Sequence, residues 1–320
     1  MKKMNNISRT VCHVLMALPL LGIMFLTACS EEETTFTDYE KDWFQLEDSS
    51  DPAQHAAYEF FKQYGIPVFF NDTIGTQQRV DVFGQEYTYY KTLTLNAAIG
   101  GGQSSYGDAF YNTFIYADRS VIPDAIQYLR TQLMPTIPNF LHIHSILLVE
   151  AINGSSDDVY VGLNTLVITK ASLLASYQAD QTKKLRAVVL RSFIGKKLTS
   201  DINYEEGLKR FYGVSRAIYE AHDVYNYSTW YFNANNMPGC PFDPYDWSVQ
   251  AKDKMLWAGF LDAAPPYFNS SPTEQADVNM FTEAYFTYTD EEFQNMYGAY
   301  PRVMEKWSII KPMLDDVMKQ

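Results

Sequence analysis

The segment Leu26-Thr27-Ala28-Cys29 ends an apolar run over residues 14–26. It separates an N-terminal segment that we expect to be removed from the part of the chain that folds. A basic N-terminus precedes the run, and small residues stand directly before Cys29. This order is typical of a secretory signal of the lipoprotein type. An uncleaved membrane anchor is the alternative, but the run is short for a bilayer span. The pattern predicts that residues 1–28 are a signal peptide and that only the remainder of the chain folds.

The residues around Cys29 also predict where the protein resides. We expect a diacylglycerol on the Cys29 thiol and a further acyl chain on its amine, and two or more chains hold a protein stably at a membrane. Three glutamates at 31–33 follow directly. They resemble the acidic export signal of lipoproteins that reach the outer face of the outer membrane in some Gram-negative bacteria, although a solvated tether is a compatible interpretation. We therefore expect a lipid-anchored, cell-surface protein of the outer membrane with an acidic tether over residues 29–50.

The net charge argues against a nucleic-acid partner, and the cysteine content argues against a disulfide-stabilised fold. Loss of residues 1–28 removes Lys2, Lys3 and Arg9 and no acid, so the net charge changes from −13 to −16. Nucleic acid is not an expected partner, because binding it requires a basic face that replaces counterions. Cys240 is the one cysteine left without a lipid, so no intramolecular disulfide can form. Stability must come from core packing.

Hydrophobic periodicity predicts an α+β fold in one domain over residues 51–320. Residues 51–170 form an α/β subregion with a small mixed sheet and helices, and residues 171–320 form a mainly helical subregion. The segment 100–107 is glycine-rich and reads as a loop, since it lacks the Lys-Ser/Thr ending of a phosphate-binding loop. The predicted helices cover residues 52–64, 121–133, 180–198, 204–222, 247–261, 274–288 and 302–318, and the predicted strands cover 67–70, 86–95, 140–149 and 158–169.

Few side chains offer recognisable chemistry. His142 and His144 stand two apart on the predicted strand 140–149, so they face the same way and form a possible metal-ligand pair. The alternative is the polar face of a half-buried strand, since no third ligand is evident. Cys240 lies in a Pro/Gly loop without a partner histidine, which favours a structural role over a nucleophilic one. A glycosidase carboxylate pair cannot be identified from spacing.

An aromatic block between residues 225 and 247 is a candidate binding surface. Its rings can stack on sugars or peptides, or they can pack as a loop over the helical core. The candidate stacking residues are Tyr227, Trp230, Tyr231 and Trp247.

Four segments give the chain a family resemblance. The chain resembles surface lipoproteins known as substrate-import-associated zinc metallohydrolases, or zinc-binding metallopeptidases. The resemblance depends on the order and separation of four segments, residues 184–195, 257–261, 274–285 and 302–311. The resemblance implies a zincin-like fold over most of residues 50–320 and zinc as the family cofactor. It also implies a nutrient-import system with a TonB-dependent transporter and a SusD-like lipoprotein as partners.

The family's zinc motif is degenerate in this chain. Members carry His-Glu-Phe-x-His, and superposition on Phe193 places Arg191, Ser192 and Gly195 at the three functional positions. A guanidinium cannot ligate zinc, a serine cannot take a proton from zinc-bound water as a carboxylate does, and glycine has no side chain. Of the family's downstream acids, Asp277 survives in this register, with Glu274 as the alternative. The resemblance thus implies a pseudoenzyme without zinc, and we expect an Arg191–Asp277 ion pair in the vacated site.

Three functions remain open from the sequence. The first is a binding or accessory lipoprotein of a nutrient-import system, with a peptide or glycan as ligand and no catalytic residue. The second is an active metal-dependent hydrolase, a peptidase with unconventional ligands such as His142 and His144. The third is a glycan-capturing surface lipoprotein unrelated to peptidases.

Overall fold

The computed structural model describes residues 41–93, 95, 114–153, 158–162, 165–246, 248–263 and 270–320. The predicted signal peptide, Cys29, the glycine-rich loop at 100–107 and Trp247 lie outside the described residues. Within the described part of the chain, no helix has the length and apolar character needed to cross a membrane. The chain divides into two units, of which the structure describes residues 41–42 and 77–89 in the first and the remaining described residues in the second. Each unit is described by itself.

The described part of the first unit is the outer end of a β-hairpin. Strands β2 (Thr73–Val80) and β3 (Glu86–Thr92) pair as a two-stranded sheet. The Asp81 carboxylate accepts the backbone N–H groups of Phe83 and Gln85 at 2.8 Å each, which closes the turn. Gly84 takes the left-handed conformation there, with φ 80°. Phe83 at the turn is 86% exposed, so the hairpin presents an apolar tip.

A four-stranded sheet lies at the centre of the α/β part of the second unit. Its order is β1-β5-β8-β7, with β1 (Val68–Phe69), β5 (Ile146–Leu148) and β8 (Leu166–Ile168) parallel and β7 (Val159–Val161) antiparallel. All residues of β5 and β8 are buried, which explains their uninterrupted apolar sequence. A small antiparallel pair accompanies the sheet, β4 (Phe114–Ile115) with β6 (Ala151–Ile152).

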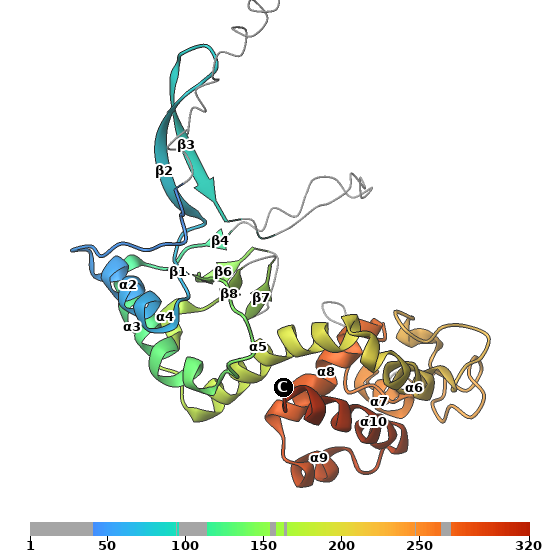
Figure 1. Cartoon of the computed structure of the whole chain (residues 1–320). Coiled ribbons are helices and arrows are strands. Elements are labelled where there is room, and N and C mark those ends of the chain that lie inside the picture. Colours follow the sequence, from blue (N-terminus) through green and yellow to red (C-terminus); the bar gives the residue numbers. More distant parts are fainter. Residues whose placement is uncertain are drawn as a thin grey trace, which may run out of the picture. The chain divides into compact units, whose positions relative to one another are not determined.

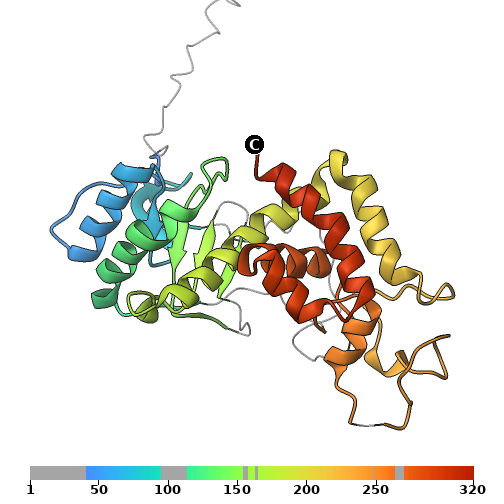
Figure 2. The same ribbon diagram turned by 90° about the horizontal axis from the view of Figure 1, so that it is seen from below.

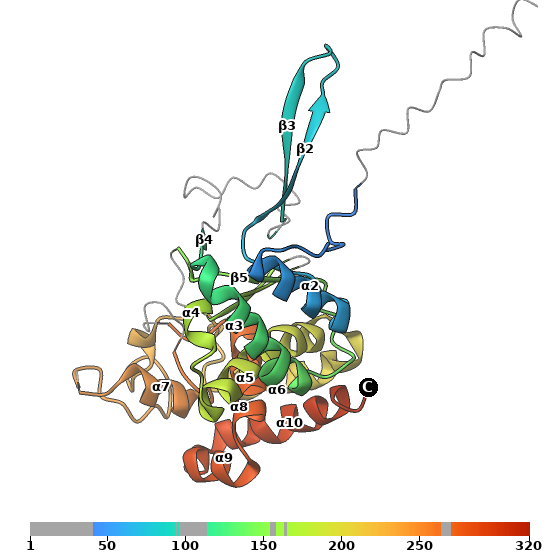
Figure 3. The ribbon, with the colours of Figure 1, turned by 90° about the vertical axis from the view of Figure 1, so that its left-hand side faces the viewer.

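Helices cover one face of this sheet (Figures 1 and 3). Helix α2 (Pro52–Tyr64) packs against α3 (Ile122–Tyr128) and β1, and their apolar residues share a core with alternate residues of β5 and β8. Asp51 caps α2 at the Gln54 N–H, 3.0 Å away, and Gly65 ends the helix with φ 68°. The other short elements here are α4 (Ala171–Leu174) and the helical turns η1 (Arg119–Val121), η2 (Leu129–Leu133) and η3 (Met134–Thr136).

Helix α5 (Ala179–Ser200) connects the sheet to the helical part of the same unit (Figure 2). It contacts β7 at one end and packs along α8 (Glu274–Thr287). The remaining helices close a continuous apolar core around α10 (Pro301–Val317), which contacts α5, α6, α7, α8 and α9. They are α6 (Glu205–Arg216), α7 (Ala251–Ala258) and α9 (Asp290–Tyr297), with the helical turns η4 (Ile202–Tyr204) and η5 (Thr229–Tyr231).

The α+β class with small sheets and a helical C-terminal half is confirmed. Two predicted strands are corrected. The segment 140–149 pairs only at Ile146–Leu148, because a turn closed by the Leu141 N–H on the Pro138 carbonyl at 3.0 Å holds its first part away from the sheet. The segment 158–169 is two short strands, β7 and β8, that pair with each other. Helix α9 and strand β2 were not predicted.

Candidate functional site

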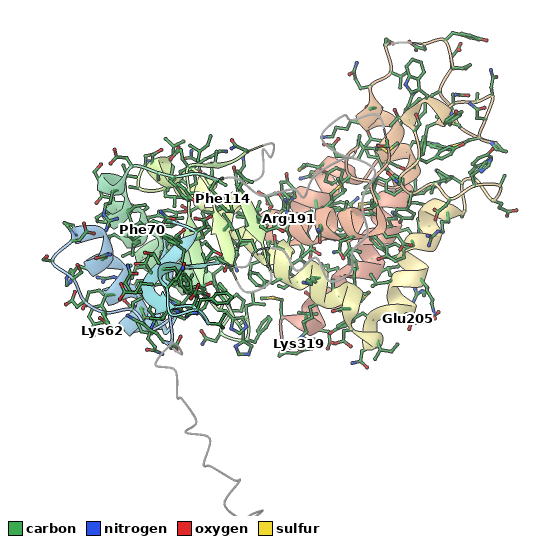
Figure 4. The ribbon with its side chains drawn as sticks, turned by 90° about the horizontal axis from the view of Figure 1, so that it is seen from above. Lys62, Phe70, Phe114, Arg191, Glu205 and Lys319 are labelled. Carbon is green, nitrogen blue, oxygen red and sulfur yellow. The ribbon has the colours of Figure 1, made fainter. Side chains whose placement is uncertain are left out.

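Arg191, Ser192 and Gly195, the residues aligned with the zinc motif, lie on α5, and Arg191 is labelled in Figure 4. Arg191 forms an ion pair with Glu283 of α8, and both side chains are about two-thirds buried. A β-carbon at Gly195 would stand 2.2 Å from Asn279 Oδ1, so the two helices approach closely because residue 195 has no side chain. Ser192 donates its hydroxyl to the Val188 carbonyl at 2.8 Å, within its own helix. These three residues provide no zinc ligand.

The predicted Arg191–Asp277 ion pair is wrong. Asp277 and Glu283 are both on α8, but Asp277 points away from α5, into the core against α10. Asp277 Oδ2 is 2.6 Å from Lys306 Nζ and accepts the Tyr225 hydroxyl at 2.8 Å. The four positions taken from the family motif therefore lie on two sides of α8 and do not line a common cleft.

Asp277 and Lys306 form a charged pair with no exposed surface. Burial raises the pKa of Asp277 and lowers the pKa of Lys306, while their mutual contact opposes both shifts. The Lys306 ammonium lies over four aromatic rings, the nearest being Phe260 at 4.3 Å from the ring centroid. In the described part of the chain, Asp277 Oδ1 has no hydrogen-bond partner. This arrangement is a buried polar contact that fixes α8 on α10.

The other predicted reactive groups do not form a site. His142 and His144 are both exposed and alternate with buried Ile143, so they share a side as expected, but they precede β5 instead of lying on it. Among the described residues, no group of three or more histidine, cysteine, aspartate or glutamate side chains is placed to hold a metal ion. Cys240 is buried, and burial raises the pKa of its thiol, which disfavours a reactive thiolate.

We expect purified protein lacking residues 1–28 to hold well below one zinc per chain after dialysis, because the side chains at the family's ligand positions cannot coordinate it. Elemental analysis by plasma mass spectrometry measures this. One tightly held zinc per chain that disappears in His142→Ala, and persists in His55→Ala, would contradict the expectation and favour the hydrolase alternative.

An aromatic cluster forms on the loop that follows α6. We define it as Tyr219, His222, Tyr227 and Tyr231. The centroid of the Tyr227 ring lies 5.9 Å from that of His222, with the two rings stacked, and 5.1 Å from that of Tyr231. The ring centroids of Tyr219 and His222 are 5.2 Å apart. Tyr231 is 48% exposed, and neighbouring Trp230 is 59% exposed. The structure thus brings Tyr227 and Tyr231 into contact with each other and adds two rings that the sequence did not single out.

The loop that carries the aromatic cluster is held in place by backbone contacts. Tyr227 exchanges hydrogen bonds with Ser271, from the Tyr227 N–H to Ser271 Oγ at 2.9 Å and from the Ser271 N–H to the Tyr227 carbonyl at 2.8 Å. Ser228 forms a β-bridge with Ser270 and caps η5. Asn226 takes a left-handed conformation, φ 51°, which an asparagine tolerates. The cluster is therefore a preformed surface.

A pocket of about 470 Å³ lies beside the same helix. We call it the α5–α6 pocket. Leu208 and Tyr212 of α6 line it together with the last turn of α5 and the first turn of α8. Arg216 stands at its rim, where it donates to Asp223 at 2.9 Å and to Glu274 at 2.6 Å. The hydrogen bond to Asp223 and the one to Glu274 raise the pKa of Arg216, so it is a fixed cation.

The sequence contains a pattern that connects the α5–α6 pocket with the aromatic cluster. Tyr212, Arg216 and Tyr219 are spaced four and three apart, the spacing of one helix face. Tyr219 lies beyond the end of α6, but its N–H bonds to the Arg216 carbonyl at 3.2 Å, so the helical turn continues to it. Core packing explains such a stripe equally well from sequence, and only the structure shows that it joins a pocket to a surface cluster.

Comparison with protein-family models, with curated proteins and with solved structures finds no match to this chain. The resemblance to zinc-binding lipoproteins thus rests on the four sequence segments.

Proposed function

We propose that this protein is a surface-anchored lipoprotein that captures carbohydrate without hydrolysing it, as an accessory of a nutrient-import system. The observation that carries the proposal is the aromatic cluster of Tyr219, His222, Tyr227 and Tyr231, with Trp230 exposed beside it. The proposed lipid anchor at Cys29 would keep this surface at the outer membrane. A TonB-dependent transporter and a SusD-like lipoprotein are the partners that the family resemblance suggests.

The cluster suits a sugar for a physical reason. One face of a pyranose ring presents C–H groups, which pack on an aromatic face, while its hydroxyls need both donors and acceptors at the edge. Here the rings are partly exposed, and the Arg216 guanidinium at the end of α6 binds the carboxylates of Asp223, which follows His222 in the chain, and of Glu274 on α8. A peptide ligand would also stack on the rings, and it is the alternative outcome of the binding test.

We further propose a zincin-like origin for the scaffold, with catalysis lost. The packing of α5 on α8 supports this at the level of the helices, because it brings together the segments 184–195 and 274–285, although Asp277 itself faces α10. The residues at those positions do not fit zinc, so no hydrolytic step is assigned to them. Binding without turnover is the activity that these side chains allow.

Tyr227→Ala and Tyr231→Ala should each reduce retention in gels that contain a neutral polysaccharide, by about threefold to tenfold in apparent affinity, because each removes one stacking ring. The measurement is affinity electrophoresis against soluble starch, xyloglucan, galactomannan and arabinoxylan. Tyr90→Ala is the matched control, since Tyr90 is 61% exposed and lies on β3, outside the aromatic block.

The proposal predicts that the wild-type protein is retarded by at least one of these polysaccharides and that the control variant behaves like it. Equal retention of the two cluster variants and the wild type would mean that the cluster is not the binding surface. Retardation by none of the polysaccharides, together with binding to a casein digest in the same buffer, would replace carbohydrate with peptide as the ligand class.

A further inference from the structure

Tyr212 has a hydroxyl group that is free to bond a ligand. Its ring is 8% exposed and packs edge-on against Phe211 and Tyr225, with centroids 5.6 and 5.5 Å away. Within the described part of the chain its hydroxyl has no hydrogen bond, whereas buried hydroxyls normally have one. Among the described residues, the wholly buried side-chain atoms without a hydrogen-bond partner belong to Asp158 and Asp277, so the Tyr212 hydroxyl is not wholly buried. Because Tyr212 also lines the α5–α6 pocket, its hydroxyl opens into that pocket.

The Tyr212 hydroxyl keeps its proton at neutral pH. Burial raises its pKa, and the negative charges of Glu274 and Asp277 raise it further. The group is therefore a hydrogen-bond donor toward the pocket. Glu274, which lines the pocket from the first turn of α8, uses one carboxylate oxygen to accept from Arg216, which leaves its other oxygen as an acceptor. The pocket therefore offers a donor from α6 and an acceptor from α8, the two kinds of group that sugar hydroxyls need.

The charges around the pocket select against an anionic ligand. Both cations that line it already face carboxylates, since Lys209 pairs with Glu205 at 2.7 Å and Arg216 pairs with Asp223 and Glu274. Asp201 adds a further negative charge at the end of α5. A carboxylate or sulfate in the pocket would meet excess negative charge without a cation to pair with. A neutral, hydroxyl-rich group meets no such penalty.

The pocket and the aromatic cluster are adjacent. Arg216, which lines the pocket, is the last residue of α6, and the Tyr219 N–H bonds to its carbonyl at 3.2 Å. The Arg216 guanidinium also binds Asp223, which directly follows His222 of the cluster. Arg216 therefore connects the lining of the pocket to the segment that carries the cluster.

We propose that the α5–α6 pocket is a subsite for one neutral sugar residue at the end of a glycan chain whose next residues stack on the aromatic cluster. Tyr212 donates a hydrogen bond to a sugar oxygen, and Glu274 accepts one from a sugar hydroxyl. This subsite rests on the proposed carbohydrate-binding function and adds to it a ligand class, neutral glycans bound by an end. The volume of about 470 Å³ is within the range of small-ligand pockets.

Tyr212→Phe tests the subsite, because it removes the hydroxyl and keeps the buried ring. Calorimetry with maltohexaose, cellohexaose, xylohexaose and mannohexaose should show affinity about threefold to tenfold weaker than wild type for the hexasaccharide that binds. Tyr285→Phe is the matched control. It deletes a tyrosine hydroxyl bonded to Asp315 at 2.6 Å, away from the pocket, and should leave the affinity unchanged.

The outcomes separate the subsite from the proposed function. If Tyr212→Phe binds like wild type while Tyr227→Ala binds more weakly, the subsite is overturned and carbohydrate capture stands. If the wild type binds none of the hexasaccharides and none of the polysaccharides, carbohydrate capture is overturned and the subsite with it. Stronger binding of oligogalacturonate than of the neutral hexasaccharides would overturn the neutral ligand class alone.

Discussion

Lys306→Ala is expected to lower the free energy of unfolding by about 3–5 kcal/mol, the usual effect of removing one partner of a buried ion pair. The variant leaves Asp277 in the core, fully buried and with only the Tyr225 hydroxyl to bond it. One of its carboxylate oxygens already has no partner among the described residues. The loss also removes an ammonium that lies over the rings of Phe211 and Phe260. Urea unfolding followed by tryptophan fluorescence measures the change.

Two further variants show whether the effect arises from the buried charge. Lys209→Ala breaks an ion pair of similar geometry between largely exposed side chains, Lys209 and Glu205, and should change stability by less than about 1 kcal/mol. Lys306→Met combined with Asp277→Asn removes both charges and should recover much of the loss. If Lys306→Ala unfolds at the same urea concentration as the wild type, Asp277 and Lys306 do not form the buried contact described above.

Cys29→Ala should abolish fatty-acid labelling almost completely, because Cys29 is the expected acylation site. A cleaved variant should move to the soluble fraction, since residues 29–320 carry a net charge of −16 that gains nothing from an anionic membrane, whereas an uncleaved precursor would stay at the membrane through residues 14–26. Metabolic labelling with a clickable fatty acid, followed by membrane fractionation, measures both effects. Cys240→Ala is the matched control, since Cys240 is buried in the fold and should not carry the label.

Equal incorporation of the fatty acid into Cys29→Ala and wild type would refute the lipid anchor. Surface exposure is a separate question. Protease added to intact cells should remove the anchored protein if it faces the medium, whereas full protection would place it on the periplasmic side of the membrane.

Helix positions were predictable because their physical cause is local. The apolar spacing and the proline at the first turn predicted a helix over residues 52–64, and the structure has Pro52–Tyr64. Residues 180–198 and 274–288 were similarly close to α5 and α8. Helix α9 was missed although Thr289 and Glu292 form a capping box, because the helix is short. Strand β2 was missed because one face has no large apolar residue and on the other Ile74 and Val80 are separated by two polar residues.

The candidate site was only partly predictable. Tyr227 and Tyr231 were picked out by the aromatic-rich sequence of their segment, and the structure places their ring centroids 5.1 Å apart. The partner of Arg191 did not follow, because alignment to a motif gives a register but not the helix face that meets α5. Asp277 is six residues before Glu283 on α8, and this spacing turns the two carboxylates toward different neighbours.

The sequence by itself determined the α+β class and the positions of the main helices, because each depends on residue type or local spacing. The tertiary structure alone decided which groups meet: Arg191 with Glu283, Asp277 with Lys306, and Tyr227 with His222 and Tyr231. The two ion pairs join residues distant in sequence, and they depend on how whole helices pack. No local pattern encodes that packing.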